Sequence, residues 1–297
     1  MREFKQLGIA RLCGFLAVLG GSAPIAAEET CPPGTLGVSR TIEVTTTGGP
    51  WFGDPYGDPN FLAAGEVVLT FDDGPSPTDT RAILAALAAE CTKATFFVVG
   101  EMVAKHPEIL SEVAAQGHTI GTHTWSHPNL ARISQGQAIR QIESAFTAAQ
   151  IASPQPVAPF FRYPYLSSSK AIVAYLKSRN VAQFAVDIDS LDWRSHDPKS
   201  VISRVMAGLK LHGRGIVLLH DIHKSTADSL PGLLAQIKAK GFKVVHLKAK
   251  STVDLLAGYS APLKQASTGG GKTLKRVQTT AHAKKTAPLD SSFWTIW

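Results

Sequence analysis

Two adjacent carboxylates, Asp72 and Asp73, end an apolar stretch and precede a Gly-Pro turn in the segment TFDDGP at 70–75. Such a turn directs the two side chains to different sides of one site, where one carboxylate binds a cation and the other handles a proton. The same letters are also ordinary turn chemistry. The pair therefore indicates a catalytic site only if other functional side chains reach the same place.

Two histidines, His123 and His127, stand four residues apart in the segment HTWSH. On a helical turn this spacing places both rings on one side, where they can share a metal ion. The spacing alone is weak support, because the chain has ten histidines and chance pairs are common. Their position directly after an apolar stretch that ends at Thr122 adds weight.

Further polar residues follow three more apolar stretches. Arg162, in RYPY at 162–165, can pair with a carboxylate beside backbone amides that serve as oxyanion donors; the alternative is an exposed loop arginine. His220 ends the stretch 216–219 and, with a carboxylate to fix its tautomer, suits general acid catalysis; the alternative is a core histidine. Carboxylates are available in the segment 187–193, DIDSLDW.

The elements that must hold these residues alternate between short β-branched stretches and helical patterns. The expected strands are 67–71, 94–99, 118–122, 160–163, 183–188, 215–220 and 243–247, and the expected helices include 80–90, 103–116, 137–150 and 198–209. This alternation predicts an α/β fold with a parallel sheet covered by helices. About seven strands without a dinucleotide glycine fingerprint favour a closed or partly closed (β/α) barrel.

In such a barrel the chemistry belongs at the carboxyl ends of the strands. Five consecutive strand ends supply polar residues to this one rim: Asp72, Asp73, His123, His127, Arg162, Asp192 and His220. One carboxylate and two histidines leave a metal position open for water, as in hydrolytic zinc sites.

The segments TFDDGP, HTWSH, RYPY, DSLDW (189–193) and LLH (218–220) resemble the five ordered motifs of the polysaccharide deacetylase family. This family, with the NodB homology domain, is carbohydrate esterase family four, and the resemblance covers roughly residues 65–250. It implies a distorted (β/α) barrel. It also implies a metal-dependent hydrolase that removes N-acetyl groups from a polysaccharide containing N-acetylglucosamine, such as peptidoglycan or chitin oligosaccharide.

The resemblance also implies roles for individual residues. Asp73, His123 and His127 would bind one divalent ion, zinc or a similar metal. Asp72 would be the base that deprotonates water, and Arg162 would hold it.

Other roles implied by the resemblance concern the substrate. The Tyr165 backbone amide would stabilise the oxyanion, and His220, oriented by Asp192 or alternatively by Asp189, would protonate the leaving amine. Trp193 would wall the acetyl pocket, and Trp125 would either do so or pack in the core. The chain departs from the family at Tyr163, where proline is common, and at Leu166, where glycine is frequent.

Two rival interpretations remain at this point. The same scaffold resembles acetyl xylan esterases, and the motifs do not separate amide from ester substrates. A non-catalytic cell-wall binding protein is the other rival, and the presence of both Asp72 and His220 disfavours it.

The amino-terminal segment 1–27 has the layout of a secretory signal peptide: three basic residues, an apolar run over 12–19 and small residues up to Ala27. It predicts export to the periplasm or outside the cell; the alternative is a retained anchor. Export would place Cys31 and Cys91 in an oxidising compartment, where they form a disulfide or stay separate as a free and a buried thiol.

The domain organisation predicted from composition has three parts after this signal. Residues 28–65 are expected to form an irregular arm, 66–258 the deacetylase domain and 259–297 a basic, disordered tail. The net charge of +7 lies wholly in 1–27 and 259–297, which argues against nucleic acid as a partner. We expect a monomer whose tail adheres to an anionic envelope.

Overall fold

The structure is a computed structural model that describes residues 31–58 and 60–259. The expected signal peptide and nearly all of the expected basic tail lie outside these residues. None of the helices described is long and apolar enough to cross a membrane.

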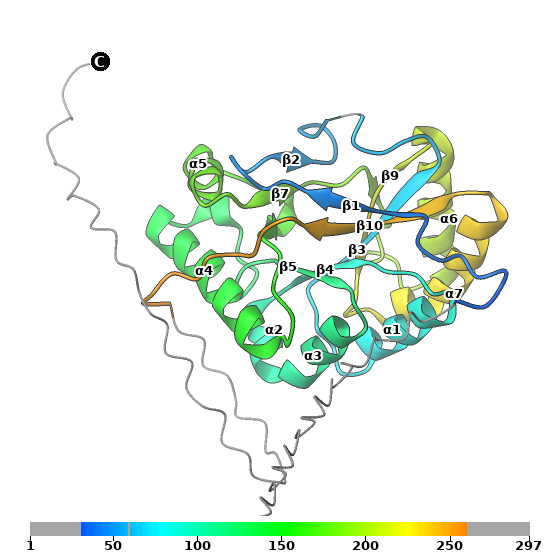
Figure 1. Ribbon diagram of the computed structural model, residues 1–297, viewed down its shortest axis with the longest axis horizontal. Coiled ribbons are helices and arrows are strands. Elements are labelled where there is room, and N and C mark those ends of the chain that lie inside the picture. Colours follow the sequence, from blue (N-terminus) through cyan, green and yellow to red (C-terminus); the bar gives the residue numbers. More distant parts are fainter. Residues whose placement is uncertain (1–30, 59, 260–297) are drawn as a thin grey trace, which may run out of the picture.

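The elements alternate along the chain (Figure 1). The strands are β1 (Arg40–Val44), β2 (Trp51–Phe52), β3 (Glu66–Asp72), β4 (Thr95–Val98), β5 (Thr119–Thr122), β6 (Phe160–Arg162), β7 (Ala182–Phe184), β8 (Ile188–Asp189), β9 (Gly215–His220) and β10 (Lys243–Ala249). The α-helices are α1 (Asp79–Ala89), α2 (Gly100–Lys105), α3 (Pro107–Ala115), α4 (Gln135–Ala152), α5 (Lys170–Ser178), α6 (Pro198–His212) and α7 (Lys224–Ala239). Short 3-10 turns cover Leu130–Arg132 and Pro164–Leu166.

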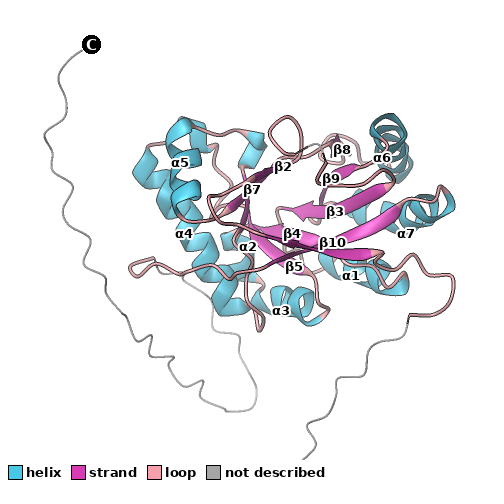
Figure 2. Ribbon diagram, turned by 45° about the horizontal axis from the view of Figure 1, so that its top comes forward, coloured by secondary structure: helices cyan, strands magenta, loops and turns pink. Residues whose placement is uncertain are grey.

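All strand pairs in the described residues are parallel, and the helices lie outside the strands (Figure 2). Strand β3 pairs with β4 on one side and with β9 on the other, and the order continues through β5, β6 and β7, while β8 pairs with β9. This arrangement confirms the distorted (β/α) barrel. The expected strand 183–188 is broken into β7 and β8.

The strand register brings the carboxyl ends together at one rim. Every residue of β3 is buried, as expected for a parallel strand with packing on both faces. Asp72 at its end lies opposite His220 of β9 and Phe97 of β4. On the other side, Arg162 of β6 lies opposite Phe184 of β7. The polar residues that end these strands therefore face the same end of the barrel.

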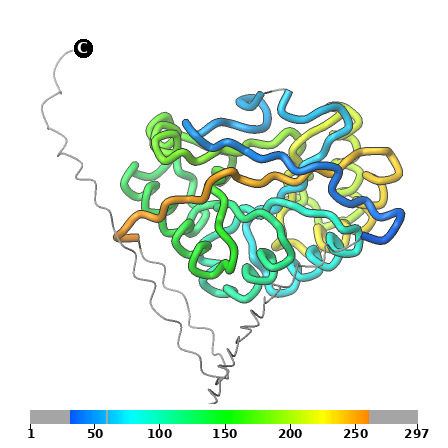
Figure 3. Tube along the Cα trace, in the orientation of Figure 1, coloured from blue at the N-terminus to red at the C-terminus, as the bar shows by residue number. Residues whose placement is uncertain are grey.

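The arm at 28–65 differs from the expectation of irregular structure, because it contributes two short strands. Strand β1 runs beside β10 (Figure 3), and β2 pairs with β7. The Trp51 ring of β2 stacks on Tyr163 with centroids 5.6 Å apart. The partners of both strands lie far away in the sequence. The local composition of the arm therefore does not reveal the pairing.

The expected helix 103–116 is two helices, α2 and α3, with His106 between them. Pro107 is the first residue of α3, and a proline in the interior of one continuous helix would remove a backbone donor and clash with the preceding turn. At the first helical position it fits without this cost.

Cys31 and Cys91 form a disulfide between the start of the arm and the end of α1, across a sequence separation of 60 residues. This resolves the alternative that the sequence left open. Since a bond that closes a loop of this size restricts the unfolded chain, we expect Cys91→Ser to destabilise the protein by about 2–4 kcal/mol. Calorimetry should show a lower Tm, and a reductant should lower the Tm of the parent protein but not of the variant. An equal Tm for both proteins would contradict a stabilising bond.

Candidate active site

A buried carboxylate, Asp72, ends β3 and is held by Arg162. The guanidinium is fully buried, and its NH1 donates to Asp72 Oδ1 at 2.7 Å and to Thr70 Oγ1 at 2.7 Å. It also lies 4.3 Å from the centroid of the Phe97 ring. Burial raises the pKa of Asp72, although the nearby Arg162 opposes this rise. A carboxylate shifted toward neutral pH is a stronger base than an ordinary one.

The next residue, Asp73, turns out of the strand with a left-handed backbone, φ 77°. A residue other than glycine adopts this conformation only when its surroundings fix it. Its amide donates to Phe97 O at 3.3 Å, and Gly74 follows. The Asp73 carboxylate lies beside His123 and His127, whereas Arg162 bonds to Asp72.

His123 and His127 meet Asp73, but not through a helical turn. His123 directly follows β5, and the segment to His127 is a loop in which Thr124 and His127 have left-handed backbones, with φ 71° and 57°. The expected geometry of two rings on one helical face is therefore wrong, although both rings reach the site. Their Nε2 atoms lie 3.6 Å and 3.4 Å from Asp73 Oδ1.

These three side chains fit a divalent metal ion, because their ligand atoms lie within 4.8 Å of one another. Asp73 Oδ1 is buried and has no hydrogen-bond partner among the described residues. His123 Nδ1 lies 2.8 Å from Arg162 O; since a carbonyl only accepts, Nδ1 carries the proton and the Nε2 lone pair faces Asp73. Burial lowers the pKa of His123 to about 3, which keeps the ring neutral as a metal ligand must be.

At the end of β9, the neighbour of β3, His220 is held by Asp192. Its Nδ1 lies 2.7 Å from Asp192 Oδ1, and its amide donates to Asp192 Oδ2 at 2.7 Å. Thr226 Oγ1 donates to the same Oδ2 at 2.6 Å, and the Trp193 amide donates to Oδ1 at 2.9 Å. Burial by itself would lower the pKa of His220, but the hydrogen bond and charge of Asp192 outweigh it and raise the pKa to about 9. The ring is thus prepared to donate a proton near neutral pH.

A cavity of about 420 Å³ opens onto all of these groups. Its lining is Asp72, Asp73, His123, His127, Tyr163, Tyr165, Leu166, Asp189, Trp193, Leu218 and His220. Three of these side chains are apolar or aromatic and exposed at the mouth: Tyr165 by 67%, Trp193 by 52% and Leu166 by 45%. Exposed rings beside polar groups suit a sugar, which has one apolar and one polar aspect.

The structure places three further residues named in the sequence analysis. Asp189 lines the cavity, but its Oδ1 accepts from the Leu191 amide at 2.8 Å, so Asp192 is the partner of His220. Trp125 does not line the cavity; it packs against Gly100 and the core. Tyr163 is buried, and its hydroxyl donates to Gln183 Oε1 at 2.6 Å.

Sequence reasoning missed Asp221, which follows His220 and is 1% exposed. Its carboxylate accepts hydrogen bonds from the Gly74 amide at 2.8 Å and from Thr80 Oγ1 at 2.6 Å. Burial raises the pKa of Asp221 to about 7. The signal that could have found it is its place directly after a strand-end histidine.

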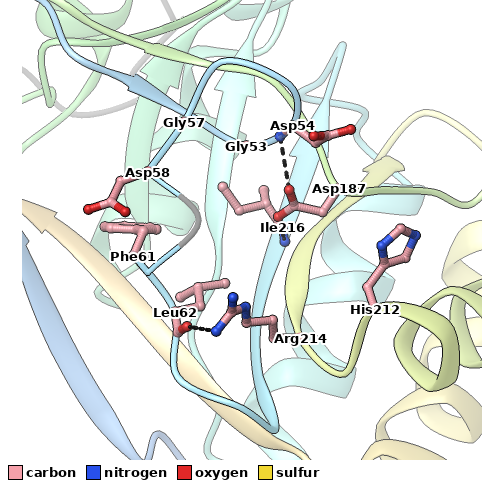
Figure 4. Close-up of a pocket in the computed structure, with 10 residues that line it drawn as sticks. All are labelled: Gly53, Asp54, Gly57, Asp58, Phe61, Leu62, Asp187, His212, Arg214 and Ile216. Carbon is pink, nitrogen blue, oxygen red and sulfur yellow. Dashed lines mark hydrogen bonds between the residues drawn. The ribbon is translucent and has the colours of Figure 1, made fainter.

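A second cavity, of about 300 Å³, lies between the arm and the amino end of β9 (Figure 4). Two of its charged side chains form hydrogen bonds with backbone groups. Asp187 accepts from the amides of Asp54 and Ile216 at 2.9 and 2.7 Å, and Arg214 donates to Leu62 O at 2.9 Å. These bonds fasten the arm to the barrel, which gives Asp187 a structural role.

The chain is similar to known proteins over this region. The family model described as polysaccharide deacetylase matches residues 62–184. A chitooligosaccharide deacetylase of Bradyrhizobium is 34% identical in an alignment over 203 residues that covers 64% of this chain and 91% of the relative. A peptidoglycan-N-acetylmuramic acid deacetylase of Bacillus subtilis is 35% identical over 182 residues, 60% of this chain.

Among solved structures, a peptidoglycan deacetylase of Bdellovibrio bacteriovorus has a TM-score of 0.67 and 35% identity. The match covers 74% of this chain and 61% of that one. The chain spans only 37% of the length of the Bacillus subtilis relative.

Proposed function

Because the chain belongs to the polysaccharide deacetylase family, we propose that it is a metal-dependent hydrolase that removes N-acetyl groups from a polysaccharide containing N-acetylglucosamine. The observation that supports the proposal is Asp73 Oδ1, which has no hydrogen-bond partner among the described residues and lies beside two histidine nitrogens. Asp72, held by Arg162, and His220, held by Asp192, line the same cavity. The substrate is an envelope glycan such as peptidoglycan, or a chitin oligosaccharide.

Asp73, His123 and His127 would hold one divalent ion. Two imidazoles and one carboxylate are ligands typical of zinc, so we propose zinc. When bound, the ion supplies Lewis acidity, which makes water more acidic and polarises the acetamide carbonyl.

Asp72 takes the proton of the attacking water. Its Oδ1 is occupied by Arg162, whereas its Oδ2 faces the metal-binding side, 3.8 Å from His123 Nε2. The buried guanidinium fixes the orientation of the carboxylate, and burial keeps its pKa raised so that it acts as a base.

His220 delivers the proton that the departing sugar amine requires. Asp192 holds Nδ1, so Nε2 is the atom that donates. The Tyr165 backbone amide, at a left-handed residue with φ 58°, is our candidate donor to the oxyanion of the tetrahedral intermediate. Trp193 and Leu218 line the same cavity and give the acetyl methyl group an apolar wall.

We further propose that the protein is exported and that residues 66–258 form the catalytic domain, with the tail at 259–297 adhering to anionic envelope material. The disulfide between Cys31 and Cys91 supports an oxidising compartment. We propose a monomer, with no nucleic acid as partner.

The proposal is tested by acetate release from N-acetylglucosamine oligomers, peptidoglycan and acetylated xylan, using purified residues 28–297. We expect release from the N-acetylated polymers, its loss with a chelator and its return with zinc, because the bound ion would supply the Lewis acidity that the reaction needs. His127→Ala should lower zinc affinity and activity together. Acetate release from acetylated xylan alone would show that the protein cleaves an acetyl ester and not an acetamide. No release from any polymer despite bound zinc would favour a non-catalytic binding role.

A further inference from the structure

A buried carboxylate outside the catalytic pairs, Asp221, connects the two strands that carry the chemistry. It follows His220 at the end of β9, and its amide donates to Asp72 O at 3.2 Å. Its side chain crosses to the turn after β3, where Oδ1 accepts from the Gly74 amide at 2.8 Å. Asp221 therefore contacts the turn that carries Asp73 without lining the substrate cavity.

The Gly74 amide belongs to the peptide bond that leaves Asp73, so its hydrogen bond fixes the backbone on the carboxyl side of that residue. The carbonyl of Gly74 is also held, because it accepts from the Val99 amide at 3.0 Å. With the Asp73 amide bonded to Phe97 O, the turn is fastened at three points. Such fastening is needed, since Asp73 has a left-handed backbone.

The fit between Asp221 and Gly74 is close. A Cβ atom at position 74 would lie 2.1 Å from Asp221 Oδ2 and 2.3 Å from Oδ1, so glycine is required where the carboxylate approaches. Two donors converge on this side chain, the Gly74 amide and Thr80 Oγ1. A carboxylate suits the position because both of its oxygens accept.

We infer that Asp221 is a positioning residue for the metal site: through the Gly74 amide it fixes the turn that aims the Asp73 carboxylate at His123 and His127. The inference rests on the proposed metal site and deepens it. Groups that do not touch the metal but fix the orientation of one of its ligands affect how tightly the metal binds. Asp221 reaches the metal through the backbone of a ligand, whereas Arg162 O reaches it through the His123 ring.

The experiment is a zinc titration of the metal-free protein against a competing fluorescent chelator, with zinc alone as the probe. We expect Asp221→Ala to weaken zinc binding about 10- to 100-fold. Asp221→Asn should bind zinc nearly as well as the parent, because its amide oxygen can still accept from Gly74. Its amino group can then donate to Thr80 Oγ1, whose own hydrogen turns to Asp221 O, 3.3 Å away.

Thr80→Val is the control: it removes the hydrogen bonds that Thr80 Oγ1 makes with Asp221 and with the Ser76 amide, and it leaves the one from the Gly74 amide to Asp221. It should lower the Tm of the metal-free protein with little effect on zinc affinity. If Asp221→Ala does not fold, Asp221→Ser carries the same test, since its side chain ends short of the Gly74 amide.

Three outcomes overturn the inference: full zinc affinity in a folded Asp221→Ala or Asp221→Ser variant, equal losses in Thr80→Val, or no rescue by asparagine. A parent protein that binds no zinc would instead refute the proposed metal site. The two failures are therefore distinguishable.

Discussion

Asp72→Asn will slow acetate release by about 10²- to 10⁴-fold, the usual contribution of a general base, while zinc still binds. The asparagine keeps the shape of the side chain and an oxygen for Arg162, whose NH1 is 2.7 Å from Asp72 Oδ1. It has no site for the proton of the attacking water. The measurement is kcat on an N-acetylglucosamine oligomer at saturating zinc, beside a zinc titration of the same variant.

Both variants remove the counter-charge of the fully buried Arg162, a loss of about 3–5 kcal/mol, but asparagine is the sharper choice because it keeps an oxygen that accepts from the guanidinium, whereas alanine removes that hydrogen bond as well. A slow alanine variant could thus reflect lost folding. The control for the asparagine variant is its Tm, which should stay high enough for the assay. Near-parental kcat with full zinc occupancy would remove Asp72 from the role of base.

The sequence predicted much of the barrel because parallel strands have a strong local signal. The strands around Asp72, His123, Arg162 and His220 were placed by their apolar stretches, and the strand-end rule then gathered their polar residues at one rim. The structure shows that this rule works through register: Asp72 lies level with His220 in the β3–β9 pair. A shift of one residue would have turned one of these side chains to the other face of the sheet.

What the sequence could not predict depends on contacts between distant segments. The left-handed residues Thr124 and His127 bring the second histidine to the site through a loop, and spacing alone suggested a helix. Strand β2 forms by pairing with β7, more than 100 residues further along the chain, so its own residues do not reveal it. The sequence analysis assigned no role to Asp221, and only the fold places its carboxylate against Gly74.

The second large effect is expected from Asp192→Asn, which should lower the pH at which activity falls on the alkaline side. His220 acts as an acid only while protonated, and Asp192 raises the pKa of its ring to about 9. The parent should therefore keep its activity as pH rises until about 9 and lose it above that. Without the carboxylate the pKa of His220 falls, so the loss begins at lower pH, and at pH 8 the rate should drop about tenfold or more.

The hydrogen bonds of Asp192 explain why asparagine cannot replace it. All four of its partners approach as donors: the amides of Trp193 and His220, Thr226 Oγ1 and the protonated His220 Nδ1. Either orientation of an asparagine sets its amino group against two of these donors. If that group faces His220 Nδ1, it stabilises the neutral ring and so opposes the charged form that the reaction needs.

Thr226→Val separates this effect from a general loss of order around Asp192. It removes one donor to Oδ2 and leaves the bond between Asp192 Oδ1 and His220 Nδ1. The pH profile of kcat/KM should therefore keep its alkaline limb near that of the parent. If Asp192→Asn and Thr226→Val move the limb equally, packing around the carboxylate and not its charge sets the acidity of His220. If neither moves it, the proton for the departing amine comes from another group.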